Sequence, residues 1–430
     1  MRLLAVLLAS SWSLAGAQEL TLAEALRLAR DNNPDLLAAR HTFASMQAKK
    51  DEATSQYFPV LTGSFTYQRQ TGNFAAKPGA MPSGFKLSTT PSTDTFNYFN
   101  FALNLQQTIF DFGRTYYAVE AAKGQASAAL KDIETVEQDV WYKVTTAYFQ
   151  VLAAQEMVEV AQRNLQQARR NEEKAAAMVE AGTRPRLEAK RAKADRLGAE
   201  SALIKAQDSL KVAKIALLQA IGLAERREDL VCVKETLGGE MSLDDAVQEA
   251  IKNRSDILAM RERLASTLAT MRLYRSNFLP SLGFTASFSD AGPEIQNIVW
   301  NFSLGAVLNV PIFNGLLPLY QMREARAQAM AMEEKLRGLE LEVRKGIEAA
   351  MSTYDDAKAA LEPVLAQVEV AKEAMLLAQT RYDSGAGTYI ELEDATAAYA
   401  NAQANLVRAE LDVSTAYAGL LRACGKGRLP

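Results

Sequence analysis

The sequence contains little of what enzymes and metal proteins need. Histidine occurs once, as His41, and cysteine occurs twice, as Cys232 and Cys424, in 430 residues. A catalytic or metal centre requires a cluster of such side chains. No Cys–His spacing of that kind and no phosphate-binding G-x-x-x-x-G-K-[ST] motif is present. We therefore predict a protein that is not an enzyme, holds no metal or cofactor, and takes any energy it needs from a partner.

Long apolar runs are also missing. The run from Leu3 to Leu14, followed by Ala15-Gly16-Ala17, is typical of a secretory signal that is cleaved before Gln18. No later stretch offers the roughly 18 uninterrupted apolar residues of a membrane-spanning helix. The formal net charge of −3 argues against nucleic acid as a partner. Two cysteines make no disulfide framework, although export would permit one bond between them, and we expect two separate thiols.

What the sequence does contain is an internal repeat. Residues 20–45 realign with residues 241–266 at an offset of 221, and residues 108–112 realign with residues 311–315 at an offset of 203. The second register continues through 181–188 against 384–391. The difference of 18 residues between the offsets predicts a longer loop between the two strands of the first half.

The repeat predicts the domain organisation. We expect a signal peptide at 1–17, a first repeat at 18–230, a linker at 231–240, a second repeat at 241–425 and a tail at 426–430. Each repeat reads as a short helix, a second helix, two strands, a very long helix and a return helix. The strands are predicted near 60–70, 96–110, 281–289 and 298–310, the long helices over 114–180 and 317–383, and the hairpin tips near 181–186 and 384–389. Helices of that length need packing partners along their whole length.

The predicted strands have one apolar face and one face of small polar residues. Trp300, Phe302 and Leu304 alternate with polar or small residues in 298–310, and Phe99 and Phe101 do so in 96–110. We expect these five residues to face lipid, because a tryptophan near a strand end suits a membrane–water interface. A soluble sheet covered by helices is the alternative, although the polar face of Asn, Ser and Thr suits a wet lumen.

Four strands are too few to close a barrel alone. An open edge in lipid would leave backbone N–H and C=O groups unpaired, and single-chain barrels begin at about eight strands. A membrane location therefore requires that several protomers share their strands.

The chain resembles the TolC-like outer-membrane efflux proteins. The duplicated halves carry the resemblance, together with IFDFGR (109–114), PIFNG (311–315), AGTRPRLE (181–188), LLQAIG (217–222) and TYIELEDATAAYANAQANL (388–406). The resemblance implies a mainly α fold with a small β part, in a homotrimer. Each protomer would give four strands to a twelve-stranded transmembrane β-barrel, and a helical tunnel of long coiled hairpins would extend into the periplasm.

The resemblance also implies the function and the location. The expected protein is an outer-membrane channel-tunnel of a tripartite efflux pump or type I secretion system. It would be a passive exit duct for small molecules or polypeptides, with a periplasmic adaptor, an inner-membrane transporter and outer-membrane lipid as partners. A periplasmic coiled-coil adaptor or scaffold without a pore is the alternative, against which the four amphipathic strands argue.

By the same resemblance, Glu391 and Asp394 match the acidic residues that line the periplasmic aperture. Their spacing of three places both carboxylates on one helix face. Threefold symmetry would gather them round one axis, where their mutual repulsion would raise their pKa values and favour cations. The alternative is a solvated acidic face that includes Glu393.

The tips contain Gly182 and Thr183 in the first half and Gly385 and Gly387 in the second. Glycine permits the positive φ that ends one helix and starts the reversal. We expect these residues to form the turns and to contact the adaptor, although turn chemistry alone would explain the glycines.

Arginine is absent from one tip position where it is common in the family. Family members often carry it soon after the second-half glycine, where Ala386 and Gly387 stand here. The candidates for an ionic lock are therefore first-half residues, either Arg184 or Arg186 together with Arg191.

Overall fold

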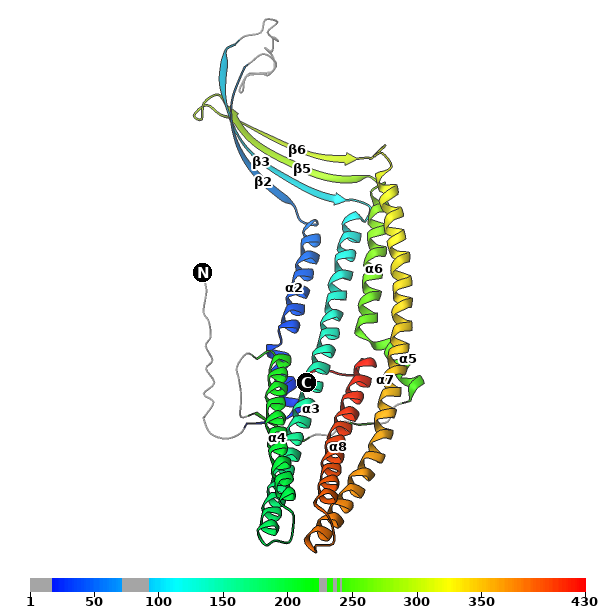
Figure 1. Cartoon of the computed structure of the whole chain (residues 1–430). Coiled ribbons are helices and arrows are strands. Elements are labelled where there is room, and N and C mark those ends of the chain that lie inside the picture. The colour runs from blue at the N-terminus through cyan, green and yellow to red at the C-terminus, as the bar shows by residue number, and fades with distance from the viewer. Residues whose placement is uncertain (1–17, 72–92, 224–229, 235–237, 240–241) are drawn as a thin grey trace. The chain divides into compact units, whose positions relative to one another are not determined.

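The computed structural model describes residues 18–71, 93–223, 230–234, 238–239 and 242–430. The predicted signal peptide and most of the predicted long loop between the first two strands lie outside these residues. Figure 1 shows the elements, which follow one another as β1 (Gln18–Leu20), α1 (Leu22–Asn32), α2 (Pro34–Ser55), β2 (Val60–Thr71), β3 (Thr95–Phe110), α3 (Arg114–Glu180), α4 (Arg186–Ile221), β4 (Leu230–Cys232), α5 (Leu243–Asn253), α6 (Ser255–Ser276), β5 (Ser281–Gly292), β6 (Val299–Asn309), α7 (Leu317–Asp383) and α8 (Tyr389–Ala423).

The chain divides into two compact units. One unit takes the described residues of 1–40, 131–257 and 338–430, and the other takes those of 41–130 and 258–337. The second unit contains the four-stranded sheet, and the first contains the tips of both helical hairpins. The predicted fold class of long helices with a small sheet is confirmed. Within the described ranges, no helix is long and apolar enough to cross a membrane.

The sheet has the strand order β2-β3-β5-β6, and all its neighbours are antiparallel. Directly opposed residues share a face, and the register aligns Phe101 with Asp290 and Asp290 with Trp300. Most of the large apolar residues of the four strands therefore lie on one face, which also carries Asp290, whereas Val299 and Val307 of β6 lie on the other face. On the opposite face the hydroxyls of Ser287 and Ser303 hydrogen-bond at 2.6 Å.

The two outer strands of the sheet have open edges. β2 and β6 each pair with one neighbour only among the described strands. Every residue of β6 is exposed, including Trp300, Phe302 and Leu304. The sheet can therefore be extended at both sides by strands from outside the chain.

The core of the first unit is built round the middle of α3. Val140, Val144 and Tyr148 are fully buried there and pack with residues of α1 and α4. The Tyr148 hydroxyl donates to one backbone carbonyl and lies within hydrogen-bond distance of another, at 2.9 Å from Leu20 O and 2.7 Å from Val233 O. These contacts attach the parallel β1–β4 pair to the helices.

The repeat is visible in hydrogen bonds as well as in element order. The Asn33 amide donates to the carbonyl of Ala220 at 2.8 Å, near the end of α4. The Arg254 guanidinium donates to the carbonyl of Ala423 at the end of α8. The offset of 221 relates the donors Asn33 and Arg254, and the offset of 203 relates the acceptors Ala220 and Ala423, so the two contacts are equivalent in the two halves. Both contacts satisfy a carbonyl that a helix end would leave unpaired.

The two cysteines are buried in the first unit, and neither is part of a disulfide. Burial raises the pKa of the Cys232 thiol to about 12, and burial also raises the pKa of the Cys424 thiol. Both thiols are therefore protonated and unreactive at neutral pH, and the expectation of two separate thiols is confirmed.

Gly222 is the first position at which we predict a measurable loss of stability. Its φ is +92°, and a Cβ there would lie 2.5 Å from the carbonyl oxygen of Asn32. Gly222→Ala should therefore lower the free energy of unfolding by about 2 kcal/mol or more, since backbone strain and a clash with backbone act together. Denaturant unfolding followed by circular dichroism measures the change.

Gly182→Ala is the matched control for that experiment. Its φ is +73°, but nothing lies within 4 Å of the added methyl group. It should lose only the strain of a left-handed residue, roughly 1 kcal/mol. Equal losses in the two variants would contradict the role given to the Asn32 contact.

Candidate functional site at the tips of the two hairpins

Each hairpin reverses in a short turn that contains a glycine with positive φ. The first turn joins α3 to α4 and has Gly182 at φ 73°, and the second joins α7 to α8 and has Gly385 at φ 80°. The Thr183 hydroxyl closes the end of α3 by donating to the Met178 carbonyl at 2.8 Å. In the second turn, the N–H of Gly387 donates to the carbonyl of Arg381 at 2.9 Å. These local bonds explain why the chain reverses at both tips.

Arg184 joins the two tips. Its guanidinium Nη2 donates to the carbonyl of Gly387 at 2.7 Å and reaches the carbonyl of Gly385 at 3.4 Å. The same group lies 5.3 Å from the ring centre of Tyr382 and 3.8 Å from the Glu188 carboxylate. Only 17% of the Arg184 side chain is exposed. A cation from the first hairpin is thus held on the backbone of the second.

The other two arginine candidates are placed differently. Arg186 is exposed, and no contact of its side chain with the second tip is found in the described part of the chain. Arg191 is exposed on α4 and lies close enough to Glu393 to lower the pKa of that carboxyl. Of the three candidates, Arg184 is therefore the one whose guanidinium hydrogen-bonds the second tip.

Apolar packing holds the hairpins together above the turns. A buried cluster combines residues of all four helices, namely Ala175, Ala192, Tyr382, Tyr389 and Leu392. Tyr382 is fully buried, and its ring meets that of Tyr389 edge to face at 5.9 Å. The hairpins can separate only if this cluster opens.

Polar contacts between α3 and α7 add to this packing. The Lys174 ammonium lies 2.9 Å from both carboxylate oxygens of Asp383. Gln167 donates to Gln379 at 3.0 Å. Lys174 and Asp383 are both about half exposed, and ion pairs of that kind contribute little each. These contacts fix the relative position of α3 and α7 but add little to the free energy that holds the two helices together.

The predicted aperture residues Glu391 and Asp394 are both exposed on the first turns of α8. Glu391 lies 3.7 Å from the Arg381 guanidinium in a half-exposed pair, which leaves most of its charge accessible to solvent. The backbone N–H of Glu391 also donates to the Thr388 hydroxyl at 3.3 Å, which caps α8. The two carboxylates are therefore accessible from solvent.

Glu393 does not share that exposed face, and its position corrects the alternative of one solvated acidic face. Its side chain is half-buried and lies close to Asp195 of α4. Burial raises the pKa of Glu393, and the Asp195 and Asp394 carboxylates raise it further. The Tyr389 hydroxyl, one turn earlier on α8, donates to Asp195 Oδ2 at 2.8 Å.

Sequence reasoning did not find Asp195 and Tyr389, and it gave Glu393 no contact of its own. The only local signal is the spacing of four between Tyr389 and Glu393, which places both side chains on one helix face. Their partner Asp195 is 194 residues from Tyr389 in the sequence. No motif links positions that far apart.

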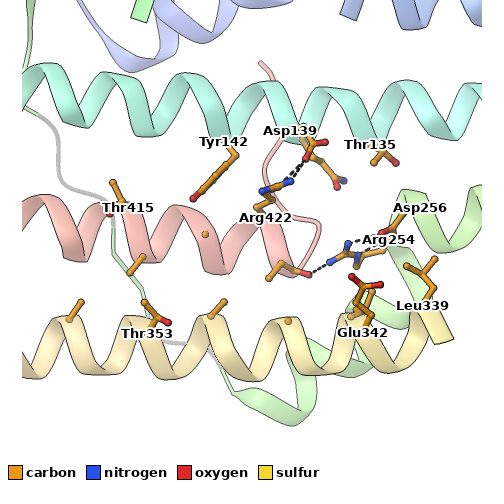
Figure 2. Close-up of a pocket in the computed structure, with 18 of the residues that line it drawn as sticks. Thr135, Asp139, Tyr142, Arg254, Asp256, Leu339, Glu342, Thr353, Thr415 and Arg422 are labelled. Carbon is orange, nitrogen blue, oxygen red and sulfur yellow. Dashed lines mark hydrogen bonds and ion pairs between the residues drawn. The ribbon is translucent and has the colours of Figure 1, made fainter. Parts of the chain in front are cut away.

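A recess in the first unit lies between α3, α7 and α8, close to the start of α6 (Figure 2). Its volume is about 960 Å³. Arg422 pairs with Asp139 at 2.8 Å and covers the ring of Tyr142 at 4.9 Å, while Arg254 pairs with Asp256 at 2.7 Å. Both guanidinium groups are thus neutralised, and the rest of the wall includes small and apolar side chains such as Leu339, Val343 and Ala350.

The fold of this chain is that of outer-membrane channels. It superposes on the Campylobacter jejuni CmeC outer membrane channel with a TM-score of 0.81 at 18% identity, over 95% of this chain and 86% of that one. It superposes on the outer membrane protein VceC from Vibrio cholerae with a TM-score of 0.78 at 20% identity, over 95% and 97% of the two chains.

The chain belongs to the outer membrane efflux protein family, whose pattern it matches over residues 25–223 and 246–426. Its relatives include the outer membrane efflux protein BepC of Brucella suis, which is 26% identical over 94% of this chain and 85% of the relative. The pyoverdine export outer membrane protein OpmQ of Pseudomonas aeruginosa is 26% identical over 97% of this chain and 87% of the relative. The family, the outer-membrane location and the role in efflux that the sequence predicted are confirmed.

Proposed function

We propose that three copies of this chain form the exit duct of an efflux system, and that the hairpin tips form its closed end. The single observation that carries the proposal is the four-stranded sheet with one apolar face and two open edges. Joining β6 of one copy to β2 of the next pairs the free backbone groups and closes a barrel of twelve strands.

In that barrel the apolar face of the sheet meets lipid. The face includes Phe99, Phe101, Trp300, Phe302 and Leu304, which the strand register joins in one surface. The opposite face, with Ser287 and Ser303, lines the wet lumen. A barrel with apolar residues outside and polar residues inside is the arrangement that outer-membrane channels use.

The tips supply the gate and the docking surface. Arg184 is the lock between the hairpins of each protomer, and Glu391 and Asp394 form an acidic ring in the aperture. A periplasmic adaptor would contact the turns at Gly182, Thr183, Gly385 and Gly387, and an inner-membrane transporter would supply the energy. The relatives support this assembly because they are outer-membrane components of export and efflux systems.

Small organic molecules are the cargo class that we propose. One relative is named for pyoverdine export, one for solvent efflux and one for toluene efflux. The charged side chains Asp139, Arg254 and Arg422 in the recess add some hydrated surface, and a passive duct needs hydrated surface more than tight binding sites.

Planar-bilayer recording tests the duct. The purified oligomer should give stepwise conductance, and its mass in detergent should be that of three chains. A heat-unfolded sample of the same preparation is the control and should give no steps. A folded oligomer without conductance steps would contradict the duct and favour the scaffold without a pore.

A further inference from the structure

A second contact between the hairpins lies above the tip turns, between α4 and α8. Tyr389 is 2% exposed, and its hydroxyl donates to Asp195 Oδ2 at 2.8 Å. Glu393, four residues later on the same face of α8, lies close enough to the same Asp195 for that carboxylate to raise the pKa of Glu393. One carboxyl group of the first hairpin therefore faces two side chains of the second.

The contact between Asp195 and Glu393 requires a proton. Two ionised carboxylates have only acceptors, so a hydrogen bond between them forms when one of the two is protonated. When both are ionised, the same pair repels. The strength of this contact therefore depends on pH, unlike the contact of Arg184 with a backbone carbonyl.

We propose that Asp195, Tyr389 and Glu393 form a proton-dependent clasp that positions the two hairpins and sets the pH range in which the duct opens. The clasp rests on the proposed duct and adds to the Arg184 lock. It acts between α4 and α8, whereas Arg184 acts between the turns. Opening requires the hairpins to part, and parting breaks both contacts.

The charged groups around Glu393 determine whether its pKa is raised or lowered when the hairpins are together. On α8, Asp394 adds a negative charge beside Glu393, and burial disfavours the ionised form further. On α4, Arg191 is the nearby positive charge and opposes both effects. On α7, the Tyr382 ring packs against Tyr389 and stays neutral at physiological pH, since burial raises the pKa of its hydroxyl. The net effect is a raised pKa for Glu393 in the closed state.

The direction of the pH effect follows from that shift. A carboxyl whose pKa is higher in the closed state stabilises closure while it is protonated. Separation of the hairpins exposes Glu393 and returns its pKa towards the ordinary value. Closure therefore loses stability as pH rises from the ordinary glutamate pKa through the raised one. Opening becomes easier at higher pH.

The test is the open probability of the full-length oligomer in planar bilayers between pH 5 and pH 8. The wild-type value should rise with pH, by about tenfold for each unit by which closure raises the pKa of Glu393. Glu393→Gln keeps a hydrogen-bond donor without the charge, so its open probability should stay low at every pH. Asp195→Asn should also remove the slope, because its amide can donate to an ionised Glu393.

Glu369→Gln is the matched control, since Glu369 is exposed on α7 and the substitution removes the same charge. It should keep the wild-type slope. A wild-type slope retained in Glu393→Gln and Asp195→Asn, or the lack of any slope in the wild type, overturns the clasp. In those cases the conductance steps persist, whereas failure of the duct itself removes the steps in every variant.

Discussion

Replacing Arg184 with glutamine is expected to raise the open probability of the duct about tenfold or more at neutral pH. The guanidinium makes a charge-assisted hydrogen bond with the Gly387 carbonyl at 2.7 Å and is largely shielded from water. Such a bond stabilises by about 1.5–3 kcal/mol. Since about 1.4 kcal/mol corresponds to a factor of ten, loss of the bond in each protomer moves the equilibrium strongly towards separated hairpins.

Two further variants distinguish the effect of the Arg184 hydrogen bond from the effect of positive charge at the tip. Arg186→Gln removes the same charge two residues away, where no contact with the second tip is found among the described residues, and should leave the open probability unchanged. Arg184→Lys keeps the charge but loses the planar fork that reaches two carbonyls and covers Tyr382. It should give an intermediate value. Equal effects of Arg184→Gln and Arg186→Gln would show that tip charge, and not the bond, controls opening.

The double substitution Glu391→Gln with Asp394→Asn is expected to abolish the preference of the duct for cations. In the proposed trimer these positions would place carboxylates from every protomer round one aperture, and a ring of carboxylates favours cations. The exposure of both side chains leaves their charges available to passing ions. Reversal potentials measured across a potassium chloride gradient report the change, which should bring the cation-to-anion permeability ratio close to one.

The matched control for this experiment is Glu362→Gln with Glu369→Gln. Both glutamates are exposed on α7, away from the tips, and the double variant loses the same net charge. It should keep the wild-type reversal potential. If the tip variant and the control behave alike, the aperture is not formed by Glu391 and Asp394.

The second tip has Gly387 where family members often carry an arginine. The position of Arg184 explains how the two tips are nevertheless joined by a hydrogen bond. The missing side chain at Gly387 leaves its carbonyl accessible, and an added Cβ there would lie 3.1 Å from Arg381 and Tyr382 atoms. The arginine comes instead from the first hairpin and uses that carbonyl as its acceptor.

Local chemistry made the helices and strands predictable. The predicted ranges 114–180 and 317–383 coincide with α3 and α7, because glycines that adopt positive φ follow each helix within two residues. The strand faces were predictable for the same reason, since alternation along one strand needs no knowledge of its neighbours. The differences lie in the strands: β5 extends to Gly292 beyond the predicted 289, β6 spans Val299–Asn309 within the predicted 298–310, and the short parallel pair β1–β4 was not predicted.

The sequence by itself determined the repeat, the long hairpins, the amphipathic strands and the membership of the efflux family, because each of these depends on residues close together or on a match along the whole chain. Only the tertiary structure decided which arginine meets the second tip, and that Glu393 joins Asp195 instead of the exposed acidic face. Those contacts join α4 and its preceding turn to α8 and its preceding turn, almost 200 residues apart. Side chains so distant meet only through the way in which the helices pack, and that packing is set by the buried cluster of Ala175, Ala192, Tyr382, Tyr389 and Leu392.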